Sequence, residues 1–570
     1  MPPFASAKTL RKIFMKTSTK SALIILWLVF ILRGSFYAAI LPIWEGYDEP
    51  YHFASLQYMV ASGTPPSLKT RISREVSASF HVLPLPWMLR LHGVSPPLYT
   101  HEDFWKLTVE QRAELQKSFH QIPPDWAKQP SPEALLNYEA QQPPLYYFLS
   151  SIPLRLVQDR SLESRVLILR LMSIVVASFA VPIGYLVAKR VTGQSTIALA
   201  VVSLATMMPE LFIDISRVGN ECLALLVYTG IIYLTVRVVE GPGQFRKMPF
   251  LGCLVGSGLL SKAYFLTALP AVLAIMLWCY WKWPRERRQL FLFSAIGLLS
   301  IFAIAGPWYW HVHQLTGSWS GLARETIASR SPLGMMGQIF HVNWISGIKS
   351  IVLSHIWFGA WSFLRVPEPW YALFGIIFAF AGLGLSICLY KHFIKKDYGR
   401  LSFAPSTGHL VVLLCFCGFF GLGLGYDILL TYVSVGVSSS TGWYMYCLIV
   451  PELLLLYYGL QSVLPRGAHA WIIPTLTTAF FLLDAYGIYF LLIPYYTGLI
   501  SHSSATGQVA PARAAVLWHV GTAEIVQRLL INKPTDMTPG AFYVLWFLSV
   551  LGSAWVVIRV WARLRVPEAR

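Results

Sequence analysis

The stretch EGYDEPYHF, residues 45–53, places carboxylates and a histidine just beyond the end of an apolar segment. Pro50 suits the first turn of a helix, so Asp48 and Glu49 are expected at its positive end, where ionised carboxylates are favoured. Such a carboxylate could take a proton from an acceptor hydroxyl or amine. With His52 as a further ligand, the pair could instead bind a divalent cation. The same pattern also fits a surface helix whose first turn is capped by solvated acidic residues, with no catalytic or metal-binding role.

The chain around these residues is strongly apolar, since 55% of its 570 residues are hydrophobic and only 13% are charged. Apolar runs of about 17–25 residues recur from end to end, and each is long enough to cross a bilayer as a helix. We therefore expect an all-α polytopic membrane protein with about 12 transmembrane helices. The expected spans are 21–41, 164–188, 195–212, 220–238, 248–262, 264–281, 291–309, 371–390, 409–430, 444–463, 470–494 and 541–560. The run 248–281 also fits one long bent helix, and 346–364 fits a further span or an interfacial helix.

The net charge of +18 does not indicate a nucleic-acid partner, because the basic side chains gather in short clusters between apolar runs. This is the positive-inside pattern, and a cytoplasmic N-terminus puts all the clusters on one side. The other side then carries the long segments 42–163, 310–370 and 495–540, which are too long to be simple connectors. They are rich in Trp, Tyr and Pro. We expect them to form juxtamembrane helices that roof a cavity, and we expect function there.

Six stretches, in this order, carry a resemblance to one superfamily. They are YDEPYH (47–52), QQPPLYYFL (141–149), LRLMS (169–173), MMPELFIDISRVGNECLALL (207–226), GLLSKAYFL (258–266) and GPWYWHVHQLTGSWSG (306–321). Together they resemble the motifs of the GT-C glycosyltransferases, multi-span enzymes that use polyprenyl-phosphate sugars. This superfamily includes relatives of the protein O-mannosyltransferases and the aminoarabinose transferases of lipid A. The resemblance covers roughly residues 20–370.

Some positions depart from the superfamily pattern. Glu221 stands where Asp is usual, and His311 and His313 occupy a region where Asn is common. The stretch TGWYMYCLIVPELLLL (441–456) looks like a span of one poorly characterised branch, but Trp443 replaces the arginine found there. If that arginine binds phosphate in the branch, another residue must do so here.

The resemblance implies a GT-C fold and an inverting transfer of one sugar from a polyprenyl-phosphate donor at the outer face of the membrane. Asp48 would be the general base that deprotonates the acceptor. Glu49 and His52 would position Asp48 or hold a divalent cation. The acceptor, whether protein, lipid or glycan, does not follow from the motifs. The compact chain has no eukaryotic sorting signals, so we expect it in the cytoplasmic membrane of a bacterium, with the site on the periplasmic or extracellular side.

The leaving phosphate of such a reaction needs fixed positive charge. Lys262 is the first candidate, because it lies at the end of an apolar helix, where a cation is costly and usually functional. Its alternative role is to snorkel to the membrane interface. The other candidates on this side are Arg170, Arg217, Arg324, Arg330 and Arg365. Glu221 would orient the acceptor or form an ion pair with an arginine. The i, i+2 spacing of His311 and His313 fits interfacial hydrogen bonding as well as metal ligation.

The expected organisation has three parts: a basic cytoplasmic N-terminus (1–20), a GT-C module (21–370) and C-terminal membrane helices (371–570). Two other functions compete with the implied transferase. A polysaccharide polymerase or ligase acting on polyprenyl-diphosphate glycans would also have about 12 spans and a large outer segment. A transporter would show internal repeats and paired broken spans, and the sequence has no such symmetry.

Overall fold

The computed structural model describes residues 18–319, 335, 337–395, 405–503 and 507–564. Within these residues, ten helical segments are long and apolar enough to cross a membrane. They are Thr19–Ile40, Leu162–Thr192, Glu221–Val238, Ala263–Lys282, Pro284–Thr316, Glu368–Lys395, Thr407–Val435, Gly442–Val463, Arg466–Tyr496 and Pro539–Leu564. The pair Ser195–Ala205 and Pro209–Ile215, bent by 65°, makes eleven when it is counted as one span. The expected all-α polytopic fold is confirmed.

Among the described residues, fifteen helices build the membrane part. They are α2 (Thr19–Ile40), α8 (Leu162–Ser178), α9 (Ala180–Thr192), α10 (Ser195–Ala205), α11 (Pro209–Ile215), α12 (Glu221–Val238), α13 (Met248–Leu259), α14 (Ala268–Lys282), α15 (Arg287–Thr316), α19 (Glu368–Tyr390), α20 (Thr407–Val435), α21 (Ile449–Val463), α22 (Ile472–Gly487), α23 (Ile493–Tyr496) and α26 (Pro539–Leu564). Short 3-10 turns join several of them, including η5 (Ala263–Thr267) and η9 (Gly442–Leu448).

The long segments between spans fold into short helices. They are α3 (Glu49–Ser62), α4 (Arg74–Ser79), α5 (His101–Lys106), α6 (Val109–His120), α7 (Leu145–Leu156), α18 (Trp344–Ile356), α24 (Ala514–Val520) and α25 (Thr522–Leu529). Two-residue strands β1 (Pro84–Leu85) and β2 (Tyr99–Thr100) pair in parallel, and the 3-10 turns η2 (Pro124–Lys128) and η3 (Tyr138–Gln141) precede α7.

One expected span, 248–262, and the run 346–364, for which a span and an interfacial helix were both open, differ from full bilayer crossings in the structure. The run 248–262 forms only the 12-residue helix α13, because the chain leaves the helix after Leu259 and becomes extended at Lys262, with φ −159°. The alternative of one long bent helix over 248–281 is therefore wrong. The run 346–364 gives α18, a helix of 13 residues, which is shorter than a bilayer crossing.

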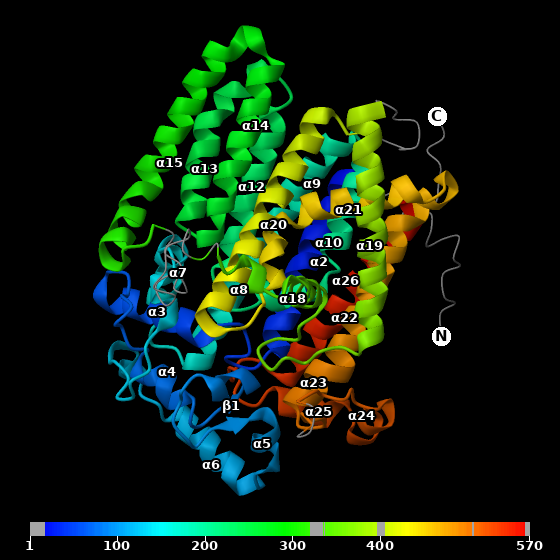
Figure 1. Cartoon of the computed structure of the whole chain (residues 1–570). Coiled ribbons are helices and arrows are strands. Elements are labelled where there is room, and N and C mark those ends of the chain that lie inside the picture. Colours follow the sequence, from blue (N-terminus) through cyan, green and yellow to red (C-terminus); the bar gives the residue numbers. More distant parts are fainter. Residues whose placement is uncertain (1–17, 320–334, 336, 396–404, 504–506, 565–570) are drawn as a thin grey trace.

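The three long segments meet at one end of the helix bundle, the lower end in Figure 1. The backbone N–H of Trp361 donates to the carbonyl of Glu45 at 3.1 Å. The indole N–H of Trp105 donates to the carbonyl of Tyr496 at 2.8 Å, and His502 Nδ1 lies 3.1 Å from Glu102 Oε1. The three long segments therefore form one connected cap over this end of the bundle.

The membrane helices differ in how much of their surface is buried inside the protein, and this difference separates inner helices from lipid-facing ones. The apolar window of Gly442–Val463 is 83% buried inside the protein, and that of Glu221–Val238 is 72% buried. The corresponding window of Pro284–Thr316 is only 17% buried, as expected for a lipid-facing helix. The inner helix α12 begins at Glu221, one of the residues described next.

Candidate active site

Asp48 lies in the turn that joins the first membrane helix α2 to the outer helix α3. It is the residue before α3 and has a left-handed backbone, φ 56° and ψ 11°, a conformation that Asp and Asn tolerate better than most residues. Its side chain does not cap the helix; it accepts a short hydrogen bond from the hydroxyl of Tyr138 instead. Because Asp48 is only half-buried, its carboxylate is accessible at the base of the cap.

Glu49, the next residue, faces the interior and is fully buried. Its two oxygens accept from Arg170 Nε at 2.7 Å and Nη2 at 2.5 Å, and also from the backbone N–H groups of Trp44 and Val218 at 3.1 and 3.0 Å. The remaining N–H groups of Arg170 donate to backbone carbonyls, including that of Leu41 at 2.7 Å. Glu49 and Arg170 thus form a buried ion pair between α2, α3 and α8, in which both side chains are fully hydrogen-bonded. This pair does not lie beside the Asp48 carboxylate.

A second group of charges lies in the break between α11 and α12. Arg217 Nη2 is 2.6 Å from Glu221 and 3.1 Å from Asp214, and Arg217 Nη1 donates to the carbonyl of Tyr47 at 2.5 Å. The other oxygen of Glu221 binds the ammonium of Lys262. The predicted residues Arg217, Glu221 and Lys262 are therefore brought together, and Glu221 forms the ion pair that was one of its two expected roles.

Lys262 occupies an aromatic environment at the start of η5. Its ammonium lies 5.3 Å from the ring centroid of Tyr264 and 4.9 Å from that of Tyr444, within the range of cation–π attraction. The side chain is nearly buried, and this burial, with the nearby Arg217, lowers its pKa. An ammonium has three donors, so the contact with Glu221 leaves two of them for a ligand.

Tyr138 and Glu139, both on η3, are functional candidates that the sequence analysis missed. Burial and the nearby Asp48 raise the pKa of Glu139. Glu139 Oε2 lies 3.9 Å from His52 Nε2, while His52 Nδ1 lies 2.7 Å from the Tyr147 hydroxyl. Burial, Arg217 and Lys262 lower the pKa of His52, so this imidazole is neutral at physiological pH. The available signal was an acidic residue two positions before QQPPLYYFL.

The stretches that carried the resemblance converge here. Asn220 donates from Nδ2 to Gln142 Oε1 at 3.1 Å and to the carbonyl of Ser261 at 3.0 Å. The backbone N–H of Leu145 donates to the carbonyl of Leu260 at 2.9 Å. Three stretches that are far apart in sequence are therefore hydrogen-bonded to one another next to the Arg217–Glu221–Lys262 group.

Other predicted residues lie away from this group. Arg365 is exposed, with its guanidinium 5.4 Å from the Phe358 ring centroid. His311 and His313 lie near the end of α15, where His313 stacks on Trp319 with ring centroids 4.0 Å apart. Arg324 and Arg330 lie outside the described residues.

Metal ligation was one of the expected roles of Asp48, Glu49 and His52. No group of three or more His, Cys, Asp or Glu side chains suited to a metal ion occurs in the part of the chain that the structure describes. The physical reason is that Glu49 points to Arg170, while His52 contacts Tyr147.

The motifs that meet at the site are those that carry the resemblance to the GT-C glycosyltransferases. Residues 141–310 match the family model of the dolichyl-phosphate-mannose-protein mannosyltransferases, which confirms the resemblance that the motifs indicate. A comparison with curated proteins gives no significant match.

Two solved structures are similar to this chain. One is ArnT from Cupriavidus metallidurans bound to undecaprenyl phosphate, with 12% identity, a TM-score of 0.40, and coverage of 98% of this chain and 77% of that one. The other is the oligosaccharyltransferase of Archaeoglobus fulgidus in its apo form, with 13% identity and a TM-score of 0.43. That match covers 95% of this chain and 56% of the oligosaccharyltransferase.

Proposed function

We propose that the chain is an inverting glycosyltransferase that moves a single sugar from a polyprenyl-phosphate donor to an acceptor at the outer face of the membrane. The main support is the position of Asp48, a half-buried carboxylate between the first membrane helix and the outer cap. The family matched by residues 141–310 is named for a dolichyl-phosphate sugar, which belongs to the same donor class.

The proposed step is a direct displacement. The acceptor oxygen attacks the anomeric carbon of the sugar while the bond from that carbon to the phosphate oxygen breaks. Asp48 takes the acceptor proton, and the electron pair of the broken bond leaves with polyprenyl phosphate. The hydroxyl of Tyr138 holds the Asp48 carboxylate in place. The configuration at the anomeric carbon inverts, because attack comes from the face opposite the phosphate.

The leaving phosphate is assigned to Lys262. Arg217 contacts two carboxylates, Asp214 and Glu221, whereas Lys262 contacts only the shared Glu221 among described carboxylates. Arg170 is committed to Glu49 and backbone carbonyls, so it supports the turn that carries Asp48. Lys262 is thus the cation of the site that contacts the fewest described carboxylates.

Changing Lys262 is expected to alter both the rate and its pH dependence. Lys262→Ala should lower transfer by about 10²–10³-fold, the usual cost of removing one group that stabilises developing negative charge. Because its pKa is lowered, Lys262 loses its charge at a lower pH than an ordinary lysine, and wild-type kcat/KM should fall on that alkaline limb. Lys262→Arg stays charged and should move the limb to higher pH. An identical alkaline limb in both proteins would remove Lys262 from this role.

A donor panel tests the function itself. Membranes containing the protein would be given labelled polyprenyl-monophosphate sugars and polyprenyl-diphosphate glycans, and release of the lipid product would be measured. We expect release of polyprenyl phosphate from one of the monophosphate donors. Consumption of the diphosphate glycans alone would favour a polymerase or ligase, and consumption of neither with a full set of acceptors would contradict both.

The outer cap is proposed to face the periplasm or cell exterior of a bacterium, with the chain in its cytoplasmic membrane. The support is the charge pattern, in which basic clusters lie on the side opposite the cap. A cysteine introduced at an exposed cap position such as Asp159 should therefore react with a membrane-impermeant maleimide in whole cells.

A further inference from the structure

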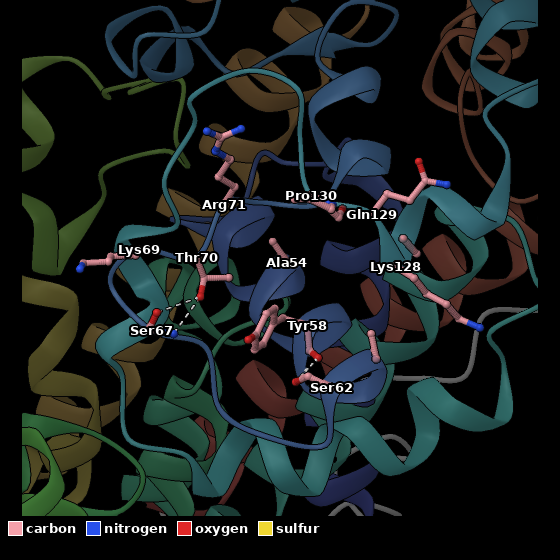
Figure 2. A pocket seen from close by; sticks show the side chains of 13 residues that line it. Ala54, Tyr58, Ser62, Ser67, Lys69, Thr70, Arg71, Lys128, Gln129 and Pro130 are labelled. Carbon is pink, nitrogen blue, oxygen red and sulfur yellow. Dashed lines mark hydrogen bonds between the residues drawn. The ribbon is translucent and has the colours of Figure 1, made fainter. Parts of the chain in front are cut away.

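The cap contains a pocket of about 570 Å³ that is separate from the Asp48 site. Figure 2 shows Ala54, Tyr58 and Ser62 from α3 along one part of the pocket, with the segments near residues 70 and 129 opposite. Its volume lies in the range of sites for small molecules and short oligomers. Neither the family match nor the proposed catalytic step uses these residues.

The charge around this pocket has a single sign. Lys69, Arg71 and Lys128 extend from its edges, and none of its 13 lining residues is acidic. Lys69 and Lys128 are exposed, and neither ammonium has a hydrogen-bonding or ion-pair partner among the residues that the structure describes. Three basic side chains on the pocket lining favour an anionic ligand over a neutral one.

The remaining lining is suited to a sugar. The ring of Tyr58 is 36% exposed and offers a flat apolar face, against which the C–H face of a sugar ring can pack. Hydroxyls of Ser62, Ser67 and Thr70 line the pocket with Tyr58 as hydrogen-bonding groups, whereas the amide of Gln129 is paired with Arg74 and Asp125. A simple phosphate site needs neither the aromatic face nor this volume.

The pocket is mechanically connected to Asp48. Asp48 directly precedes α3, which carries Ala54, Tyr58 and Ser62 of the pocket; its rise of about 1.5 Å per residue puts Ala54 about 9 Å and Ser62 about 21 Å from Asp48 along the helix. The backbone N–H of Asn137 donates to the carbonyl of Thr70 at 2.9 Å, and Asn137 Nδ2 donates to the carbonyl of Tyr51 at 3.0 Å. The next residue, Tyr138, binds Asp48. A ligand in the pocket is thus held at a fixed distance from the base.

We propose that this pocket binds an anionic sugar unit of the acceptor, more than one sugar away from the hydroxyl that reacts at Asp48. The inference rests on the proposed transferase function and narrows its acceptor from protein, lipid or glycan to an acidic saccharide. The saccharide is either free or carried on a lipid, and the anionic group is a carboxylate or phosphate.

Binding can be measured without catalysis, on the purified full-length protein and without donor. The probes are cellobiuronic acid, its neutral counterpart cellobiose, and inorganic phosphate, followed by ligand-observed NMR at low salt. We expect cellobiuronic acid to bind the wild type at least about tenfold more tightly than cellobiose. Lys69→Glu/Lys128→Glu should weaken it about tenfold or more, whereas the exposed cap lysines changed in Lys106→Glu/Lys117→Glu should change affinity less than about threefold.

Three results would overturn the proposal: equal binding by wild type and Lys69→Glu/Lys128→Glu, phosphate binding as tight as that of the sugar acid, or displacement of the sugar by phosphatidylglycerol vesicles. The last result would indicate a lipid-surface site. Comparing sugar binding with transfer, in the wild type and in Asp48→Asn, separates the two proposals. If the wild type binds the sugar normally but transfers nothing, the proposed pocket ligand stands and the transferase proposal is contradicted. If it transfers sugar but shows no selective binding, the transferase proposal stands and the proposed pocket ligand is contradicted.

Discussion

Asp48→Asn is expected to lower sugar transfer by about 10²–10⁴-fold, the range that a positioned general base contributes. Asn has the same shape as Asp and tolerates the left-handed conformation at φ 56°, so the turn should be kept. Its amide oxygen can still accept from Tyr138, but it cannot take a proton from the acceptor. The measurement is release of polyprenyl phosphate under single-turnover conditions, together with the thermal unfolding midpoint of the purified protein.

The matched control is Asp159→Asn, which changes an exposed carboxylate of the same outer segment. It should leave both transfer and the unfolding midpoint unchanged. Near-normal transfer by Asp48→Asn would exclude Asp48 as the base, and a large fall in its unfolding midpoint would mean that the loss of transfer reflects misfolding.

The membrane architecture was predictable because burial in lipid demands long apolar helices, and these are visible in composition. The misplaced end of the 248–262 run has a local cause. Apolar residues continue through Leu260, but the chain folds back after Leu259 and places Phe265 so close to Gly258 that a Cβ there would lie 2.2 Å from the ring. Hydropathy does not report such close packing, nor the extended backbone at Lys262 that ends the helical path.

The site was only partly predictable, for the same kind of reason. Lys262 was identifiable as a lone cation in an apolar stretch, but its partner Glu221 lies 41 residues away in sequence. Glu139 lies on a four-residue 3-10 turn that has no helical or strand periodicity. Asp48 and Glu49 are adjacent and chemically alike, and only the fold separates an accessible carboxylate from one enclosed by Arg170.

Glu49→Ala is expected to destabilise the fold by about 3–5 kcal/mol, the typical cost of removing one partner of a buried ion pair. The change would leave the Arg170 guanidinium, 1% exposed, without its carboxylate, and the backbone N–H groups of Trp44 and Val218 without an acceptor. It should be detected as a lower thermal unfolding midpoint and lower yield. Arg170→Ala should have a similar effect, for the converse reason.

The double variant Glu49→Ala/Arg170→Ala tests whether Glu49 has a structural role, as the partner of Arg170, or a catalytic role. When both charges are removed, no unpaired buried charge remains, so the double variant should be less destabilised than the sum of the two single changes. If Glu49 only supports the turn, partial recovery of the unfolding midpoint should bring partial recovery of transfer. If Glu49→Ala instead unfolds like the wild type yet transfers nothing, Glu49 acts in the chemistry, and the assignment of Asp48 as the sole base is wrong.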